Sequence, residues 1–212
     1  MNLTGKTIAI TDADGPLPGA FAAAFGQHGA TVERIQQNTD PAEFVTACPD
    51  IEALIYIPPV LPSGPTLELM QHAEPLNTLT AEIGRFMRLF QAVGGAMASR
   101  QHGCILIVGG LSGSTGWPGY AFPSALYGAL LALTRSLACE LATQNVRVLY
   151  LSHGAVEDYT PGAFAARAPA GKAATPDEIA RVAVHLASDR ASFMTGTEIR
   201  ADGGWKAWGL LK

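Results

Sequence analysis

The chain has 212 residues, which is enough for one hydrophobic core and short for two domains, so we predict one domain over residues 1–212. A net charge of −4 and a pI near 5.7 argue against a nucleic-acid partner. Only 15% of the residues are charged, where about 25% is usual, and this apolar composition suggests either large buried interfaces or a single large core.

The cysteines and the apolar runs bear on the compartment. Cys48, Cys104 and Cys139 are widely spaced and form no CxxC pair, which is typical of a reducing environment. No apolar run reaches the roughly 18 residues that cross a membrane, and residues 1–9 lack a signal-peptide pattern. We therefore expect a cytoplasmic protein without membrane contact. The scattered histidines predict no metal site.

The first half of the chain alternates short apolar runs with helical patterns. This alternation is typical of βαβ units around a parallel sheet. We expect strands at residues 6–11, 31–35 and 53–57, and helices at 19–28 and 43–47.

The second half continues the alternation with longer helices. A long helix is expected over residues 80–100, where apolar side chains recur at helical spacing, and a second, apolar almost all round, over 124–142. Strands are expected at residues 104–108, 146–151 and 197–200. Thr175, Pro176 and Glu178 form the pattern of a capping box and predict that a further helix begins there.

Residues 175–204 (TPDEIARVAVHLASDRASFMTGTEIRADGG) resemble the closing segment of short-chain dehydrogenases/reductases. Residues 130–141 (LLALTRSLACEL) and 103–113 (GCILIVGGLSG) resemble the same family. The resemblance implies an α/β fold, a three-layer, Rossmann-like, doubly wound parallel sheet. The family typically has seven strands, but the stretch between Ile35 and Ala53 is too short for a helix, an edge strand and a return. We therefore predict six strands, with the usual third strand missing or vestigial.

The resemblance also locates the nucleotide loop. The family pattern TGxxxGxG falls on residues 11–18, where Asp12, Pro16 and Pro18 replace the three glycines. A carboxylate at Asp12 would repel a phosphate by about 4 kcal/mol at about 4 Å. Each proline deletes an N–H that phosphate could accept from. Further cofactor contacts of the family fall on Gln36 and on residues 57–60 (IPPV). We therefore predict that NAD(P) binding is lost and that no cofactor is held.

The catalytic positions of the family can be located in the same way. Its serine, tyrosine and lysine fall on Gly110, Pro123 and Tyr127. In the family the tyrosine acts as general acid or base, the lysine lowers its pKa, and the serine holds the substrate oxygen. Glycine and proline have no side-chain proton to give, and a phenol cannot replace an ammonium. We therefore predict no catalytic residue at these positions.

Neighbouring residues offer alternatives that the sequence leaves open. Tyr120 precedes the lost tyrosine by three residues, but no lysine lies on that helix to lower its pKa from about 10. Ser112 and Ser114 follow the lost serine, where a polar turn is the simpler interpretation. His153 falls where the crevice of the family would be, and a lone histidine is more often structural than a base.

The parts retained are those that build interfaces in the family. The resemblance implies that helices 80–100 and 124–142 pair with another subunit, and that the C-terminal tail, with Trp205 and Trp208, builds a second contact. Charged residues could rim the long helices, namely Arg85, Arg88, Arg135 and Glu140. Both tryptophans could instead fold back onto their own core.

These observations predict a catalytically inactive member that serves as a structural or supporting subunit. Its partner would be an active paralogue, and a homo-oligomer is the simpler assembly. Two other classes stay open: an oxidoreductase with displaced catalytic residues, and a small-molecule binding or regulatory module.

Overall fold

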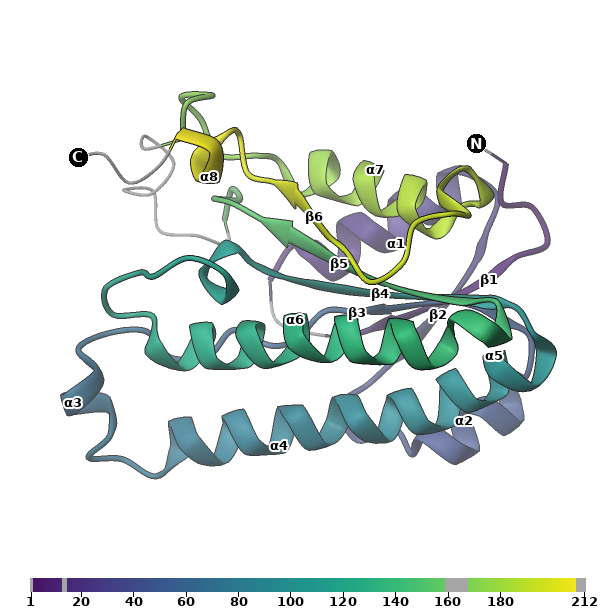
Figure 1. Ribbon diagram of the computed structural model, residues 1–212, viewed down its shortest axis with the longest axis horizontal. Coiled ribbons are helices and arrows are strands. Elements are labelled where there is room, and N and C mark those ends of the chain that lie inside the picture. The colour runs from purple at the N-terminus through teal and green to yellow at the C-terminus, as the bar shows by residue number, and fades with distance from the viewer. Residues whose placement is uncertain (1, 13–14, 159–167, 209–212) are drawn as a thin grey trace.

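The computed structural model describes residues 2–12, 15–158 and 168–208. Its centre is one parallel sheet of six strands, in the order β2-β1-β3-β4-β5-β6 (Figure 1). The strands, in chain order, are β1 (Thr7–Thr11), β2 (Thr31–Ile35), β3 (Ile51–Tyr56), β4 (Gly103–Gly110), β5 (Val146–His153) and β6 (Glu198–Ala201). The predicted α/β doubly wound architecture is confirmed, including the number of strands.

The edge of the sheet at β2 confirms the missing third strand. Only one short helix, α2 (Pro41–Ala47), lies between β2 and β3. Asp40 caps it by accepting the backbone N–H groups of Ala42 and Glu43 at 2.9 and 3.0 Å. The chain then returns directly to β3, which pairs with β1 on the side opposite β2. The carboxyl ends of β1 and β3 therefore flank the point where the strand order reverses.

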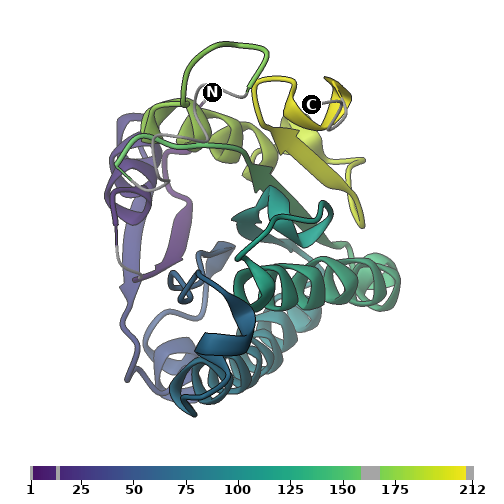
Figure 2. The ribbon, with the colours of Figure 1, turned by 90° about the vertical axis from the view of Figure 1, so that its left-hand side faces the viewer.

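Helices cover both faces of the sheet and make three layers (Figures 1 and 2). One face carries α1 (Leu17–Gln27) and α7 (Pro176–Ala187), which contact each other. The other face carries α2, α4 (Glu74–Leu89), α5 (Gly95–Arg100) and α6 (Ala121–Leu141). Two hydrophobic clusters, one on each face, form the core.

The long helix expected over residues 80–100 differs in its start and in its middle. It begins at Glu74, with Pro75 in the first turn, where a missing N–H costs nothing. A π-helical turn at Phe90–Gly94 separates α4 from α5. Arg85, predicted at the rim of an interface, is instead buried and lies 3.7 Å from the equally buried Glu82. That part of the rim prediction is wrong.

Helix α6 requires a second correction. With the turn that follows it, the segment Ala121–Gln144 is long and apolar enough to cross a membrane, by length and composition alone. The expectation that no such stretch exists is therefore wrong. In the fold this helix packs along β4, β5 and α4, and its buried residues include Leu126, Leu130 and Thr134. The packing accounts for part of the apolar composition, since 39% of the apolar window is buried inside the fold, on the sides that face the sheet and α4.

The predicted capping box at the start of α7 is confirmed. The Thr175 hydroxyl accepts the backbone N–H of Glu178 at 3.2 Å, and the Glu178 carboxylate accepts the backbone N–H of Thr175 at 2.8 Å. Lys172 donates to the other carboxylate oxygen at 2.9 Å. The start of α7 is therefore fixed by side chains, whereas the N-cap residue of α1, Pro16, provides no side-chain hydrogen bond.

The two tryptophans at the C-terminal end take different places. The short helix α8 (Trp205–Trp208) buries Trp205, which is 5% exposed, and leaves Trp208 62% exposed. Asp202 anchors the helix by accepting the backbone N–H groups of Gly204 and Lys206, both at 3.0 Å. The rest of the predicted tail contact, residues 209–212, lies outside the described residues.

Candidate functional site

A cavity of about 220 Å³ lies at the carboxyl ends of β4 and β5. The parallel register of these strands sets Gly110 beside His153 at that edge. The cavity brings together the three catalytic positions of the family, Gly110, Pro123 and Tyr127. Three of the four alternative residues, Ser112, Tyr120 and His153, also line it. The full lining consists of Val60, Leu61, Ser63, Gly110, Leu111, Ser112, Trp117, Tyr120, Pro123, Tyr127, His153 and Gly154.

Tyr127 is packed against the glycines of the segment that follows β4. A Cβ atom on Gly110 would lie 2.8 Å from Cε2 of the Tyr127 ring, which is closer than real Cβ atoms come. A Cβ atom on Gly113 would lie 2.7 Å from Cβ of Tyr127. The ring therefore occupies the space that a serine side chain at position 110 would need, and the residues at 110 and 127 fit each other as a pair.

Pro123 and Tyr120 are placed by the start of α6. Pro123 is the third residue of the helix, where the missing N–H is tolerated, and it is buried. Tyr120 is the N-cap residue, and its carbonyl accepts the backbone N–H of Ser124 at 2.8 Å. The helix start thus places both Tyr120 and Pro123 in the lining of the cavity.

The Tyr120 hydroxyl is hydrogen-bonded to the side chain of Ser63, from the loop after β3. Burial raises the pKa of Tyr120 above its usual value of about 10, and the Ser63 contact opposes this rise only in part. The phenol therefore stays protonated at neutral pH. It can donate or accept a hydrogen bond, and it is a weak base.

His153 is almost completely buried at the end of β5. Its Nδ1 lies 2.9 Å from the carbonyl oxygen of Gly154, and since a carbonyl can only accept, Nδ1 carries the proton. Burial lowers the pKa of His153, with a smaller opposing effect of the Gly154 carbonyl. At neutral pH the ring is uncharged, and Nε2 is its acceptor nitrogen.

Two serines follow β4, and the structure separates them. Ser112 lines the cavity and is 7% exposed. Ser114 lies outside the lining and is held in a polar cluster with α8 and β6: it accepts from Lys206 at 2.7 Å and donates to Glu198 at 2.8 Å. The prediction of a polar turn therefore describes Ser114, while Ser112 belongs to the cavity.

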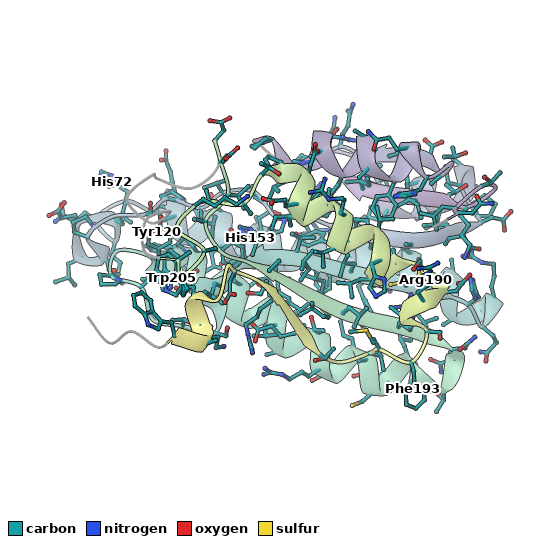
Figure 3. The ribbon with its side chains drawn as sticks, turned by 90° about the horizontal axis from the view of Figure 1, so that it is seen from above. His72, Tyr120, His153, Arg190, Phe193 and Trp205 are labelled. Atoms are coloured by element: carbon teal, nitrogen blue, oxygen red, sulfur yellow. The ribbon has the colours of Figure 1, made fainter. Side chains whose placement is uncertain are left out.

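An aromatic wall closes one side of the cavity. Trp117 packs edge-on against Tyr120, with ring centroids 5.4 Å apart, and stacks on Trp205 of α8 at 4.9 Å. Figure 3 shows Tyr120, Trp205 and His153 together at one end of the molecule, while Phe193 and Arg190 lie toward the other end. The C-terminal helix thus supports the wall of the cavity from behind.

The nucleotide loop lies at a separate place, at the carboxyl end of β1. Asp12 is paired with Arg34 of β2, whose Nε donates to the carboxylate at 2.6 Å. Nη1 of the same guanidinium donates to the carbonyl oxygen of Pro18 at 3.0 Å. Pro16 and Pro18 start α1, so two residues at this helix start have no N–H to donate. A carboxylate at this place and the missing donors do not fit an NAD(P) diphosphate.

The Thr11 side chain joins the carboxyl ends of β1 and β3. The Thr11 hydroxyl donates to the carbonyl oxygen of Ile57 at 3.0 Å and accepts its backbone N–H at 2.8 Å. These bonds hold the ends of β1 and β3 together and are fully buried. Gln36, predicted near a ribose contact, instead accepts a hydrogen bond from Arg85 through its carbonyl oxygen at 3.4 Å.

Three residues that complete the cavity and the nucleotide loop were not predicted from the sequence. Arg34 had a usable signal, because an exposed arginine two positions before Gln36 reaches the same sheet edge as Asp12. Ser63 and Trp117 had none, since each comes from a loop whose path depends on the tertiary fold. Within residues 2–12, 15–158 and 168–208, no group of three or more His, Cys, Asp or Glu side chains could hold a metal ion.

Comparison with known proteins agrees with this fold. Residues 51–206 match a sequence profile of the family described as enoyl-(acyl carrier protein) reductase. The chain is 30% identical over 143 residues to the 3-oxoacyl-[acyl-carrier-protein] reductase FabG of Escherichia coli, a match that covers 64% of this chain and 59% of that protein.

Two further similarities are informative. The chain is 34% identical over 138 residues to the inactive 2-(S)-hydroxypropyl-CoM dehydrogenase 2 of Xanthobacter autotrophicus, covering 58% of this chain and 60% of that protein. A solved structure from Beutenbergia cavernae, provisionally described as an NAD(P)-dependent gluconate 5-dehydrogenase with NADP at low occupancy, superposes with a TM-score of 0.87 at 26% identity, covering 97% and 98% of the two chains.

These findings, together with the sheet order, define the class. The chain belongs to the short-chain dehydrogenase/reductase family of oxidoreductases. The sequence matches to FabG and to the Xanthobacter protein span about three fifths of those relatives' length. Active reductases and a protein named as inactive both stand among these relatives, so membership alone does not decide activity.

Proposed function

We propose that this chain is a catalytically inactive family member that acts as a supporting subunit for an active dehydrogenase of the same family. The observation that carries the proposal is the pairing of Gly110 with the Tyr127 ring. The serine and the lysine of the family are replaced by Gly110 and Tyr127. In addition, the Tyr127 ring packs on Gly110 and fills the space that a serine side chain would need.

The nucleotide loop supports the same proposal. The Arg34 guanidinium donates to the Asp12 carboxylate and to the Pro18 carbonyl oxygen. These N–H groups, which lie near the position of the diphosphate, are therefore already bound to the protein itself. An incoming diphosphate would have to compete with this ion pair and approach a second anionic group. We propose that NAD(P) is not bound.

The supporting role rests on the apolar surface that the fold retains. Leu76, Ile83 and Met87 follow one another along α4 at spacings of seven and four residues, which places them on one helical stripe. Leu76 and Met87 are exposed, and α6 lies beside α4 (Figure 2). Exposed Trp208 on α8 offers a second contact. We propose that these surfaces bind the partner in the cytoplasm, without nucleic acid or membrane.

A titration tests the loss of cofactor binding. NADH and NADPH are titrated into the purified chain and into the double variant Pro123→Tyr/Tyr127→Lys, which restores two catalytic side chains. FabG of Escherichia coli is the positive control. We expect no saturable change in dinucleotide fluorescence with either form and no oxidation of NADPH, because the nucleotide loop is unchanged. Saturable binding by the unaltered chain, or turnover by the double variant, would contradict the proposal.

A second candidate is an oxidoreductase with displaced catalytic residues, favoured by the presence of Tyr120 and His153 in one cavity. Its weakness is the raised pKa of Tyr120, since no lysine lines the cavity among the described residues to lower it. The same titration separates the two candidates, because a displaced catalyst still requires the dinucleotide.

A further inference from the structure

We propose that the active dehydrogenase inserts a basic amphipathic helix into a groove at the starts of α4 and α6. This inference rests on the proposed supporting role and names the chemistry of the segment by which the partner binds. The groove is separate from the cavity at the ends of β4 and β5, since the two share no lining residue in the described part of the chain.

The groove has a volume of about 480 Å³ and is formed by three segments. They are α3 (Thr66–Leu69) with the turn that follows it, the first turns of α4, and the start of α6. Figure 1 shows α3 beside the starts of α4 and α6, at one end of the molecule. The large apolar side chains in the lining are Met70, Leu76, Leu79 and Phe122.

The outer side of the groove is open. Met70 is 67% exposed and Leu76 is 58% exposed, and Leu67 of α3 is exposed as well. Several large apolar side chains exposed at one place on a protein mark a surface that another molecule covers. A small ligand would cover only the floor of such a groove, whereas an amphipathic helix that lies along it covers the floor and both sides.

The groove continues the apolar stripe of α4. Leu76 belongs to both, because it lines the groove and begins the stripe that leads to Ile83 and Met87. A partner that binds along α4 therefore reaches the groove at one end of the contact. The flexible side chain of Met70 can adapt there to the shape of an inserted residue.

The charge of the segments around the groove selects a basic helix. Glu68 of α3 and Glu74 of α4 are both exposed. No Lys or Arg occurs in the sequence between Arg34 and Arg85, and residues 101–134, which include the start of α6, contain no Asp, Glu, Lys or Arg. Lys or Arg side chains beside the apolar stripe of an inserted helix would complement the two carboxylates.

The helix starts at the groove do not reverse this preference. The starts of α4 and α6 are each equivalent to about +0.5 elementary charge, which the full charges of Glu68 and Glu74 outweigh. The same carboxylates argue against a membrane as the molecule that covers the groove, because the cytoplasmic surface of a membrane is itself anionic. A basic helix of a protein is therefore the occupant that both the apolar lining and the charge favour.

A photo-cross-linking amino acid identifies the occupant. p-Benzoylphenylalanine replaces Met70 in the full-length chain, and the complex isolated from its own cells is irradiated. We expect a cross-link to a helix of the active family member that carries Lys or Arg beside an apolar stripe. The same amino acid in place of Phe193, an exposed ring far from His72 of the groove (Figure 3), should give no cross-link to that helix.

Variants test the apolar and the charged contacts in the same complex. Met70→Ser should weaken binding of the partner by about tenfold, because a large apolar side chain no longer lines the groove. Phe193→Ser is its control and should leave the affinity unchanged. Thermal unfolding shows whether each variant keeps its fold.

Glu74→Lys should weaken binding by about three- to tenfold, and the loss should shrink at high salt, which screens exposed charges. The matched control is Glu43→Lys, which reverses a charge in the first turn of α2 as Glu74→Lys does in the first turn of α4. It should bind the partner like the unaltered chain.

The inference fails if the cross-link from position 70 is absent or reaches a second copy of this chain, a lipid or any other segment. It also fails if Met70→Ser and Glu74→Lys bind the partner as tightly as the unaltered chain does. In these outcomes the complex with the active family member still forms, so the supporting role stands. If native mass spectrometry finds no such complex, the supporting role fails and this inference fails with it.

Discussion

At the scale of single residues, the catalytic positions have been remodelled as a fitted set. A Cβ atom at Gly110 would overlap the Tyr127 ring, and a Cβ atom at Gly113 would overlap the Cβ and the backbone of Tyr127. The backbone of Gly110 is in the extended region, at φ −77° and ψ 154°, which any residue adopts. Only the contact with Tyr127, and not backbone strain, therefore excludes a side chain at position 110.

This fit leads to a prediction for Gly110→Ser. The variant should lower the free energy of unfolding by about 1–3 kcal/mol through overpacking. Tyr127→Ala removes the ring, so in that background the serine should cost much less. Urea unfolding of both single variants and the double variant measures the coupling. Gly116→Ser is the control, because a Cβ atom there meets nothing within 4 Å. Additive losses in the double variant would contradict the fit.

A buried polar group also lies in α4, away from the cavity. Tyr56 donates to the Glu82 carboxylate at 3.1 Å, and the Arg85 guanidinium lies 3.7 Å from the same oxygen. Burial, followed by the nearby Glu82 charge, raises the pKa of Tyr56, so its hydroxyl remains a donor. Arg85 also donates to the Gln36 carbonyl and so ties α4 to the end of β2.

Arg85→Met should therefore be strongly destabilising, by about 3 kcal/mol, because it leaves the Glu82 carboxylate buried without a counter-charge. Adding Glu82→Gln should restore most of that loss. Arg88→Met, an exposed change on the same helix, should have little effect. Chemical unfolding of the four proteins provides the measurement, and equal stability of the Arg85 and Arg88 variants would exclude the buried ion pair.

At the scale of elements, the best-defined start of a helix is that of α7. Its capping box and the Lys172 contact fix the first turn from both sides. Lys172, followed by the backbone N–H of Thr175, holds the pKa of Glu178 below its usual value. The carboxylate therefore stabilises the folded state at neutral pH, and this contribution disappears as the pH falls through the lowered pKa.

Thr175→Ala should lower stability by about 1 kcal/mol, since it removes the acceptor of the Glu178 N–H. Thr46→Ala, a change of the same type inside α2, is the control. Glu178→Gln should differ from the unaltered chain at neutral pH, and the difference should shrink as the pH falls through the lowered pKa of Glu178. Thermal unfolding across pH checks both expectations, and a Glu178→Gln effect that grows with acidity would refute the assigned sign.

At the scale of the whole molecule, the sequence predicted the sheet well. The spacing between Ile35 and Ala53 was enough to remove one strand, since chain length alone limits what fits there. The π-helical turn at Phe90–Gly94 and the burial of Arg85 could not be predicted, because both depend on how α4 packs against the sheet.

The candidate site was predicted in part. Gly110, Pro123, Tyr127, Tyr120 and His153 were identified from the sequence, and the fold brings them to one cavity. The place of Ser112 in the cavity lining and the stacking of Trp117 on Trp205 were not predicted. The stacking joins segments nearly 90 residues apart, and the place of Ser112 depends on the shape of the cavity. Hydrophobic periodicity in the sequence encodes neither.

The central claim is that this chain supports an active dehydrogenase, and native mass spectrometry of the protein isolated from its own cells, without added cofactor, tests it most directly. We predict a complex with a second family member that retains the serine, tyrosine and lysine, and with dinucleotide mass only on that partner. A homo-oligomer alone, or dinucleotide mass on this chain, would contradict the claim.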